Sequence, residues 1–60
     1  MTNDEIRYRI DQEIHKEKYR RILKRKLIDG ITYEALAEEE DMSPRGVQEI
    51  LRKCKPIIFQ

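Results

Sequence analysis

The sequence has 60 residues, of which 42% are charged and 38% hydrophobic, and its formal net charge is +1. A chain of this length makes one domain at most, with a marginal core that rarely contributes more than roughly 3 to 5 kcal/mol. The single cysteine excludes an internal disulfide, and one cysteine with one histidine makes no metal site. The sequence has no long apolar run and no signal peptide, which predicts a cytoplasmic protein without a membrane partner.

A first helix is predicted over residues 3–16. Thr2 or Asn3 is a suitable N-cap, and acidic residues follow in the first turn, where they favour the helix dipole. Its apolar residues lie on one face: Ile6, Ile10 and Ile14. Two arrangements of this stripe stay open. It packs against Ile57, Ile58 and Phe59 within one chain, or it is a possible interface that joins two copies in a homodimer.

A second helix is predicted from about Glu17 to Ile28, with an apolar stripe made of Tyr19, Ile22, Leu23 and Leu27. On one continuous helix, this stripe and the isoleucine stripe would lie on nearly opposite sides. The chain therefore bends at residues 15–17, or a long helix turns the isoleucines away from the core. Gly30 is expected to end the second helix, because glycine readily takes the left-handed conformation of a C-terminal cap.

Two shorter helices are predicted next, separated by the turn Asp41-Met42-Ser43. Thr32 is the N-cap of the third helix, and Ser43 is that of the fourth, with proline at the first helical position. We expect the fourth helix to end at Pro56. A longer helix before two short ones is the layout of a helix-turn-helix, whose second short helix enters the DNA major groove.

The predicted elements make a small all-α domain without strands. Residues 17–55 are expected to form a trihelical helix-turn-helix core, with the recognition helix at about residues 44–54. The N-terminal helix adds to this core, and residues 56–60 form a C-terminal tail.

The predicted recognition helix carries an outward stripe opposite Val47 and Ile50. Its residues have the i, i+3, i+4, i+7 spacing of one face: Arg45, Gln48, Glu49 and Arg52. An ordinary solvated face has the same spacing. The side-chain chemistry favours base reading, because arginine pairs with guanine, glutamine pairs with adenine and glutamate accepts from cytosine.

The sequence YRRILKRKLIDGITYEALAEEEDMSPRGVQEILRK, residues 19–53, resembles the C-terminal DNA-binding domain of bacterial sigma factors. It also resembles short sigma-like helix-turn-helix proteins of prophages and mobile elements. The matching parts are ILKRKLIDG, TYEALAEE and SPRGVQEI. This resemblance implies a trihelical fold and base reading by the outward stripe. Two residues depart from the family pattern: Glu40, where relatives usually have an apolar residue, and Gly46, where they often have threonine.

Several polar residues near the helix ends are candidate phosphate contacts: Thr32, Ser43, Lys53 and Lys55. The run Lys24-Arg25-Lys26 is either a solvated face or a further phosphate-contacting edge. His15 has no candidate nucleophile or second base beside it, and the sequence has no phosphate-binding glycine loop. We therefore expect no enzymatic activity, and no metal, cofactor or small-molecule substrate.

Charge is strongly segregated along the chain. Residues 18–28 carry six basic residues and no acid, and residues 29–41 carry six acids and no base. Helical phase places Glu38 and Glu39 on the outer side of the third helix and Asp41 in the turn. Glu40 lies on the core side, so we expect it to pair with a basic residue of the second helix, such as Lys26, or to lie at the margin of the core.

Together these features predict a sequence-specific protein that binds double-stranded DNA, with a role as a sigma-like transcriptional regulator. Two alternatives stay open. One is a protein-interaction module that contacts RNA polymerase or another regulator, and the other is a small self-assembling helical protein.

Overall fold

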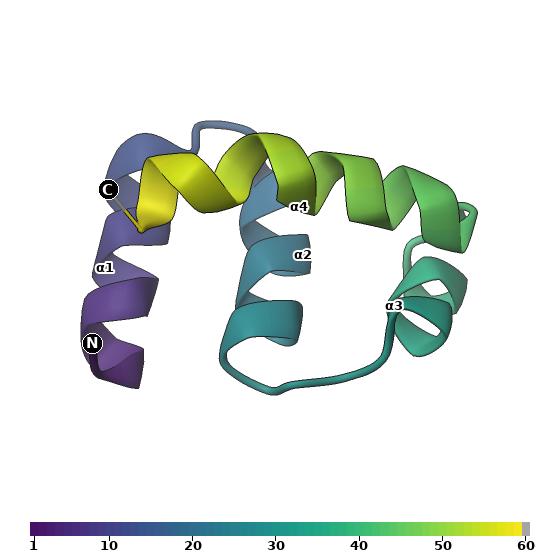
Figure 1. Cartoon of the computed structure of the whole chain (residues 1–60), viewed down its shortest axis with the longest axis horizontal. Coiled ribbons are helices and arrows are strands. Elements are labelled where there is room, and N and C mark those ends of the chain that lie inside the picture. The colour runs from purple at the N-terminus through teal and green to yellow at the C-terminus, as the bar shows by residue number, and fades with distance from the viewer. Residues whose placement is uncertain (60) are drawn as a thin grey trace.

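The computed structural model describes residues 1–59 and contains four helices within them. They are α1 (Asn3–Glu13), α2 (Glu17–Leu27), α3 (Tyr33–Glu39) and α4 (Pro44–Ile58). The helices α1 and α2 stand side by side, α4 crosses both, and α3 packs against α2 and the N-terminal half of α4 (Figure 1). The predicted all-α fold is confirmed. None of these four helices is both long and apolar enough to cross a membrane.

The chain bends between α1 and α2, as one of the two predicted alternatives requires. Ile14 has extended backbone angles, with φ −107° and ψ 120°, and the next helix begins at Glu17. Arg20 of α2 reaches back to the end of α1 and donates hydrogen bonds to the carbonyl oxygens of Ile14 and Asp11. Because these carbonyls have partners after the bend, α1 can end at Glu13 without a glycine or proline.

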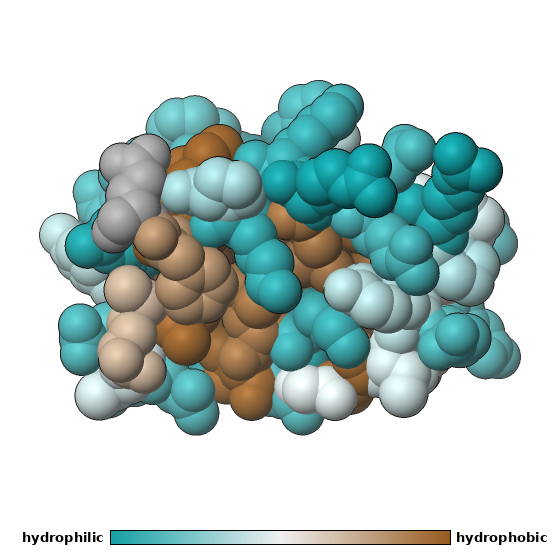
Figure 2. All heavy atoms as spheres, viewed as in Figure 1, coloured by the Kyte–Doolittle hydropathy of each residue, from teal (hydrophilic) through white to brown (hydrophobic). Residues whose placement is uncertain are grey.

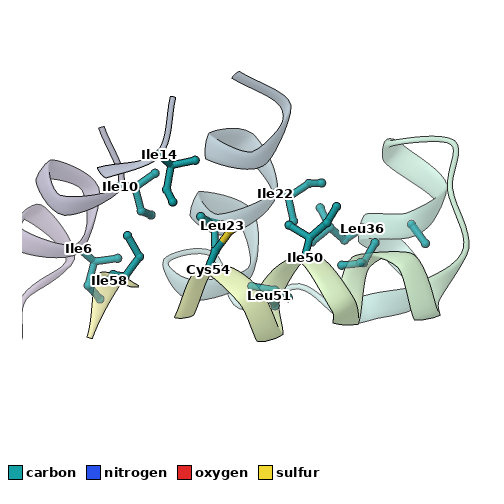
Figure 3. Packing of buried hydrophobic residues seen from close by; sticks show 12 residues of the cluster. Ile6, Ile10, Ile14, Ile22, Leu23, Leu36, Ile50, Leu51, Cys54 and Ile58 are labelled. Carbon is teal, nitrogen blue, oxygen red and sulfur yellow. The ribbon is translucent and has the colours of Figure 1, made fainter. Parts of the chain in front are cut away.

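The bend turns both apolar stripes into a single core, which Figure 3 shows along the length of α4. Ile6, Ile10 and Ile14 are all buried within the chain. In Figure 3, Ile6 lies next to Ile58, which is 0% exposed. The predicted intrachain packing is therefore present, and these three isoleucines leave no apolar stripe on the surface. The prediction that Ile57 and Phe59 also pack against this stripe is wrong, since these two residues are 36% and 46% exposed.

The prediction that the fourth helix ends at Pro56 is also wrong. The helix continues through Pro56 to Ile58, so residues 56–58 are helical rather than part of a tail. Pro56 has no N–H for the carbonyl of Arg52, but it lies on the exposed side of α4, where water can solvate that oxygen. One further turn carries Ile58 into the core beyond Cys54. Burial of Ile58 therefore offsets the loss of one helical hydrogen bond.

Cys54 lies on the buried face of α4 with Val47 and Leu51. Burial raises the pKa of its thiol, which keeps the sulfur in its neutral form. The residue therefore acts as a small apolar side chain in the core.

Candidate nucleic-acid interface

The turn between α3 and α4 has a defined hydrogen-bond pattern. Glu40 caps α3, and Asp41 follows it in the left-handed conformation, with φ 56°. The N–H of Asp41 donates to the carbonyl of Glu38 at 3.3 Å, and the N–H of Met42 donates to the carbonyl of Ala37 at 2.9 Å. This pair of bonds is a Schellman motif. It directs Met42 toward the core and fixes where α4 begins.

The first turn of α4 explains the glycine at position 46. Ser43 is the N-cap, and its hydroxyl oxygen accepts a hydrogen bond from the N–H of Gly46 at 3.1 Å. A Cβ atom on Gly46 would lie only 3.0 Å from the Cε of Met42 and 3.4 Å from the Oγ of Ser43. Glycine therefore leaves room for the Met42 methyl group, and a β-branched threonine would crowd it further.

The four candidate base-reading residues all lie on the exposed face of α4: Arg45, Gln48, Glu49 and Arg52. The side chains of Arg45 and Glu49 are 89% and 59% exposed, and Arg45 Nε lies 3.8 Å from Glu49 Oε1. The opposite face is fixed in the core by Val47, Ile50, Leu51, Cys54 and Ile58. The four residues of the predicted stripe therefore lie together on one face of α4. Packing of the opposite face in the core keeps this face turned outward.

The candidate phosphate contacts divide into two pairs. Lys53 and Lys55 are exposed, and each lies about 80° around α4 from Arg45, one on either side of the stripe. Thr32 and Ser43 are N-caps whose hydroxyl oxygens accept from backbone N–H groups at 3.1 Å. Their hydroxyl protons remain available for donation to an anionic oxygen.

Glu39, the last residue of α3, and Glu40, its C-cap, face two arginines of α2. Arg21 donates two hydrogen bonds of 2.7 Å to the carboxylate of Glu40, and Arg25 donates bonds of 3.1 and 2.6 Å to that of Glu39. Arg25 also donates to Asp29 at 2.9 Å. The hydrogen bonds from Arg21 and Arg25 hold the pKa values of Glu40 and Glu39 below their usual range. Three of the six acids in residues 29–41 therefore form ion pairs within the fold: Asp29, Glu39 and Glu40.

The predicted pairing of Glu40 with the second helix is present, but the example partner Lys26 is wrong. The ammonium of Lys26 donates to the carbonyl of Ile31 at 2.9 Å and lies 4.3 Å from the ring centroid of Tyr33. Arg21 lies closer to the end of α3 and has the planar, two-donor geometry that a carboxylate accepts.

The run Lys24-Arg25-Lys26 is engaged inside the protein. Lys24 forms an ion pair of 2.8 Å with Asp11 of α1, while Arg25 and Lys26 bind the partners described above. These three residues are only partly exposed. Lys24 links α2 to α1 and Arg25 links α2 to α3, so the cations of this run already have partners within the fold.

Sequence patterns alone did not single out Arg21 and Arg25 as the residues that position α3. Their i, i+4 spacing places both guanidinium groups on one side of α2, which is the available signal. Beside them, an open polar hollow between α1 and α2 is lined by Asp11, Glu17, Arg20, Arg21 and Lys24. Its arginines and its lysine already bind protein oxygens, which leaves no cation there for a ligand.

Comparison with known proteins found no matching family model, curated protein or solved structure.

Proposed function

We propose that this protein binds double-stranded DNA in a sequence-specific way, with α3, the turn and α4 acting as a helix-turn-helix. The single observation that supports this most is the exposed face of α4. It combines two arginines, a glutamine and a glutamate on a helix whose other face is held in the core. A helix is about 10 to 12 Å wide with its side chains, and the major groove is about 12 Å wide.

The chemistry of the exposed face suits base reading. Arg45 and Arg52 have the geometry to pair with guanine, Gln48 with adenine, and Glu49 with the amino group of cytosine. The contact between Arg45 and Glu49 is long and solvated, so its loss on binding costs little free energy. Both side chains are therefore free to exchange this contact for one to a base edge.

The internal ion pairs support DNA binding by reducing repulsion. Glu39 and Glu40 are balanced by Arg25 and Arg21, so their charges do not act alone on a phosphate backbone. On α4, four exposed basic residues surround the single acid Glu49: Arg45, Arg52, Lys53 and Lys55. If Lys53 and Lys55 each neutralise one phosphate, log affinity falls with log salt concentration with a slope of about −1.8.

Selection from a random duplex pool, followed by gel-shift titration at about 50 mM salt, tests this proposal. We expect an enriched sequence, and a loss of about 1 to 3 kcal/mol in binding free energy for Arg45→Ala or Arg52→Ala, with relaxed sequence preference. Arg7→Ala is the matched control, because Arg7 is an exposed arginine on α1. The absence of any duplex binding at this salt concentration would contradict the proposal. The cellular role that we propose for this DNA binding is the regulation of transcription.

A second candidate function is supported by the exposed side of α3. Glu34 and Glu38 are exposed and form no ion pair with any other residue in the range 1–59. An acidic surface of this kind suits contact with a basic patch on a protein such as RNA polymerase. A polymerase pull-down that survives Arg45→Ala with Arg52→Ala, but is lost with Glu34→Lys and Glu38→Lys, would favour this function over DNA binding.

A further inference from the structure

We propose that the exposed face of α4 reads the two DNA strands separately, with one side of the face on each strand. This inference rests on the proposed function and adds which residues share a strand. Gln48 and Lys55 contact one strand, and Glu49 and Lys53 contact the other. All four residues are exposed. Figure 2 shows hydrophilic side chains along α4 on the visible face of the molecule.

Two arginines define the middle of this face. Arg45 and Arg52 are seven residues apart, so they lie about 20° from each other around α4. The opposite side of the helix is buried in the core, where Val47 and Leu51 are 0% and 2% exposed. A line through the two arginines, which we call the arginine line, therefore points away from the core and runs nearly parallel to the axis of α4.

The other four polar residues diverge from the arginine line in two matching pairs. Gln48 lies about 50° to one side of this line, and Glu49 lies about 50° to the other side. Lys55 lies farther around the helix on the Gln48 side, at about 70°, and Lys53 lies on the Glu49 side at about 90°. Each side therefore carries one base-reading group and, beyond it, one cation.

This order of groups matches the cross-section of the major groove. The base edges form the floor of the groove, and the phosphate backbones of the two strands border it on either side. The two bases of a pair lie side by side across the floor. With the arginine line toward the floor, Gln48 and Glu49 reach different strands, because they diverge by about 100°. Each lysine then reaches the phosphates on its own side of the groove.

The length of the arginine line limits the number of base pairs that α4 reads. Seven residues of helix span about 10.5 Å, and three base-pair steps of about 3.4 Å span about 10 Å. A helix that is inclined to the DNA axis covers fewer steps over the same length. The core that α4 reads is therefore at most four base pairs long, with guanines for Arg45 and Arg52 toward its two ends.

Glu49 determines specificity on its own strand. An ionised carboxylate only accepts hydrogen bonds, and cytosine presents a donor in the major groove, whereas guanine and thymine present acceptors there. Adenine places an acceptor beside its donor. Glu49 is the one acid among residues 44–59. It favours cytosine both through the hydrogen bond that it accepts and through its repulsion of the acceptors on the other bases.

The role of Glu49 is tested by selecting bound duplexes from a random pool with the full chain and with Glu49→Gln. We expect the original chain to select a core with cytosine on one strand and adenine on the other. Glu49→Gln should change the cytosine to adenine, with at least about fivefold preference for the new duplex, and leave the position read by Gln48 unchanged. Glu13→Gln is the matched control at an exposed position of α1 and should change neither position. Unchanged selection by Glu49→Gln would overturn this role.

The strand assignment of the two lysines is tested with neutral methylphosphonate groups, placed one at a time on either strand of the selected duplex. In gel-shift titration we expect sensitive positions on both strands, each weakening binding by about threefold or more. Lys53→Ala should remove the sensitivity on the strand that carries the cytosine, and Lys55→Ala should remove it on the strand that carries the adenine. Loss of sensitivity on the same strand in both variants would overturn the strand assignment alone. If the chain binds no duplex, the assignment and the proposed function both fail.

Discussion

Arg21 of α2 and Glu40 at the end of α3 form a two-point ion pair, with Nε to Oε2 and Nη2 to Oε1 both at 2.7 Å. The two residues are 19 positions apart in the sequence. The Glu40 side chain is only 6% exposed, whereas that of Arg21 is 55% exposed. Glu40 is therefore a carboxylate at the margin of the core, and a solvated guanidinium balances its charge.

Glu40→Gln should lower the free energy of unfolding by about 1 kcal/mol. The amide keeps the shape of the side chain but loses the charge and one acceptor oxygen, and the effect is modest because Arg21 stays in water. Urea denaturation followed by circular dichroism measures the change. Glu38→Gln, at an exposed position on the same helix, is the control and should stay within about 0.5 kcal/mol of the original chain. Equal stability of both variants would show that the pair contributes nothing.

The stability of the protein should fall in acid because of the same contacts. Hydrogen bonds from Arg25 and Arg21 lower the folded-state pKa values of Glu39 and Glu40 below the usual 4.5. The unfolded chain then binds protons at a higher pH than the folded chain does. The stabilisation is complete above pH 4.5 and is lost as the pH falls through the lower folded-state values.

Urea titrations from about pH 7 to about pH 3 measure this dependence. In the double variant Glu39→Gln with Glu40→Gln, the fall in acid should be shallower. It should not vanish, because the pKa values of Asp11 and Glu5 are also lowered, by hydrogen bonds involving Lys24 and Thr2. An unchanged slope in the double variant would show that these two carboxylates keep ordinary pKa values in the folded protein.

Asp41→Gly should stabilise the protein by up to about 1 kcal/mol relative to Asp41→Asn. Position 41 has φ 56°, where glycine has no Cβ to clash with the following carbonyl. The comparison with asparagine separates the backbone effect from the loss of negative charge before α4. Thermal unfolding provides the measurement, and Asp41→Ala should be the least stable of the three variants. An alanine variant as stable as the glycine variant would contradict the left-handed turn.

Pro56→Ala should also stabilise the protein. Alanine restores the N–H that can bond to the Arg52 carbonyl, and proline inside a helix costs up to about 3 kcal/mol relative to alanine. We expect a gain of at least about 1 kcal/mol in urea denaturation, since Pro56 lies only two residues before the end of α4. Pro44→Ala is the control, because proline suits the first helical position and its removal should bring no gain. A loss of stability in Pro56→Ala would mean that the proline fits this turn without strain.

The spacing of apolar residues predicts most of this fold. The stripes of α1 and α2 predict two faces that one straight helix cannot bury together, and the chain bends where they meet. The N-caps Thr32 and Ser43 predict the starts of α3 and α4, because a side-chain oxygen there replaces a missing helical partner. The outward position of the stripe from Arg45 to Arg52 follows from the same periodicity.

The remaining features depend on distances between elements, which local patterns do not contain. Pro56 predicts a helix end, but the outcome depends on what Ile58 can contact one turn later. Similarly, several basic residues of α2 are available to Glu40 by charge alone. Arg21 is its partner because of how α2 and α3 pack, while Lys26 is held by a nearby carbonyl.

The packing of Ile6 and Ile58 in one core has a consequence for the order in which the protein folds and opens. These residues are 52 positions apart, so the packing of α1 against the end of α4 closes almost the whole chain into one loop. Closing such a loop costs about 3.5 kcal/mol of chain entropy, whereas α3 and α4 meet across a short turn. We therefore expect the packing between α1 and the last turn of α4 to form after the contacts between helices that are neighbours in sequence, and to open before them. In native-state hydrogen exchange, the amide protons of the last turn of α4 should exchange before those of α2.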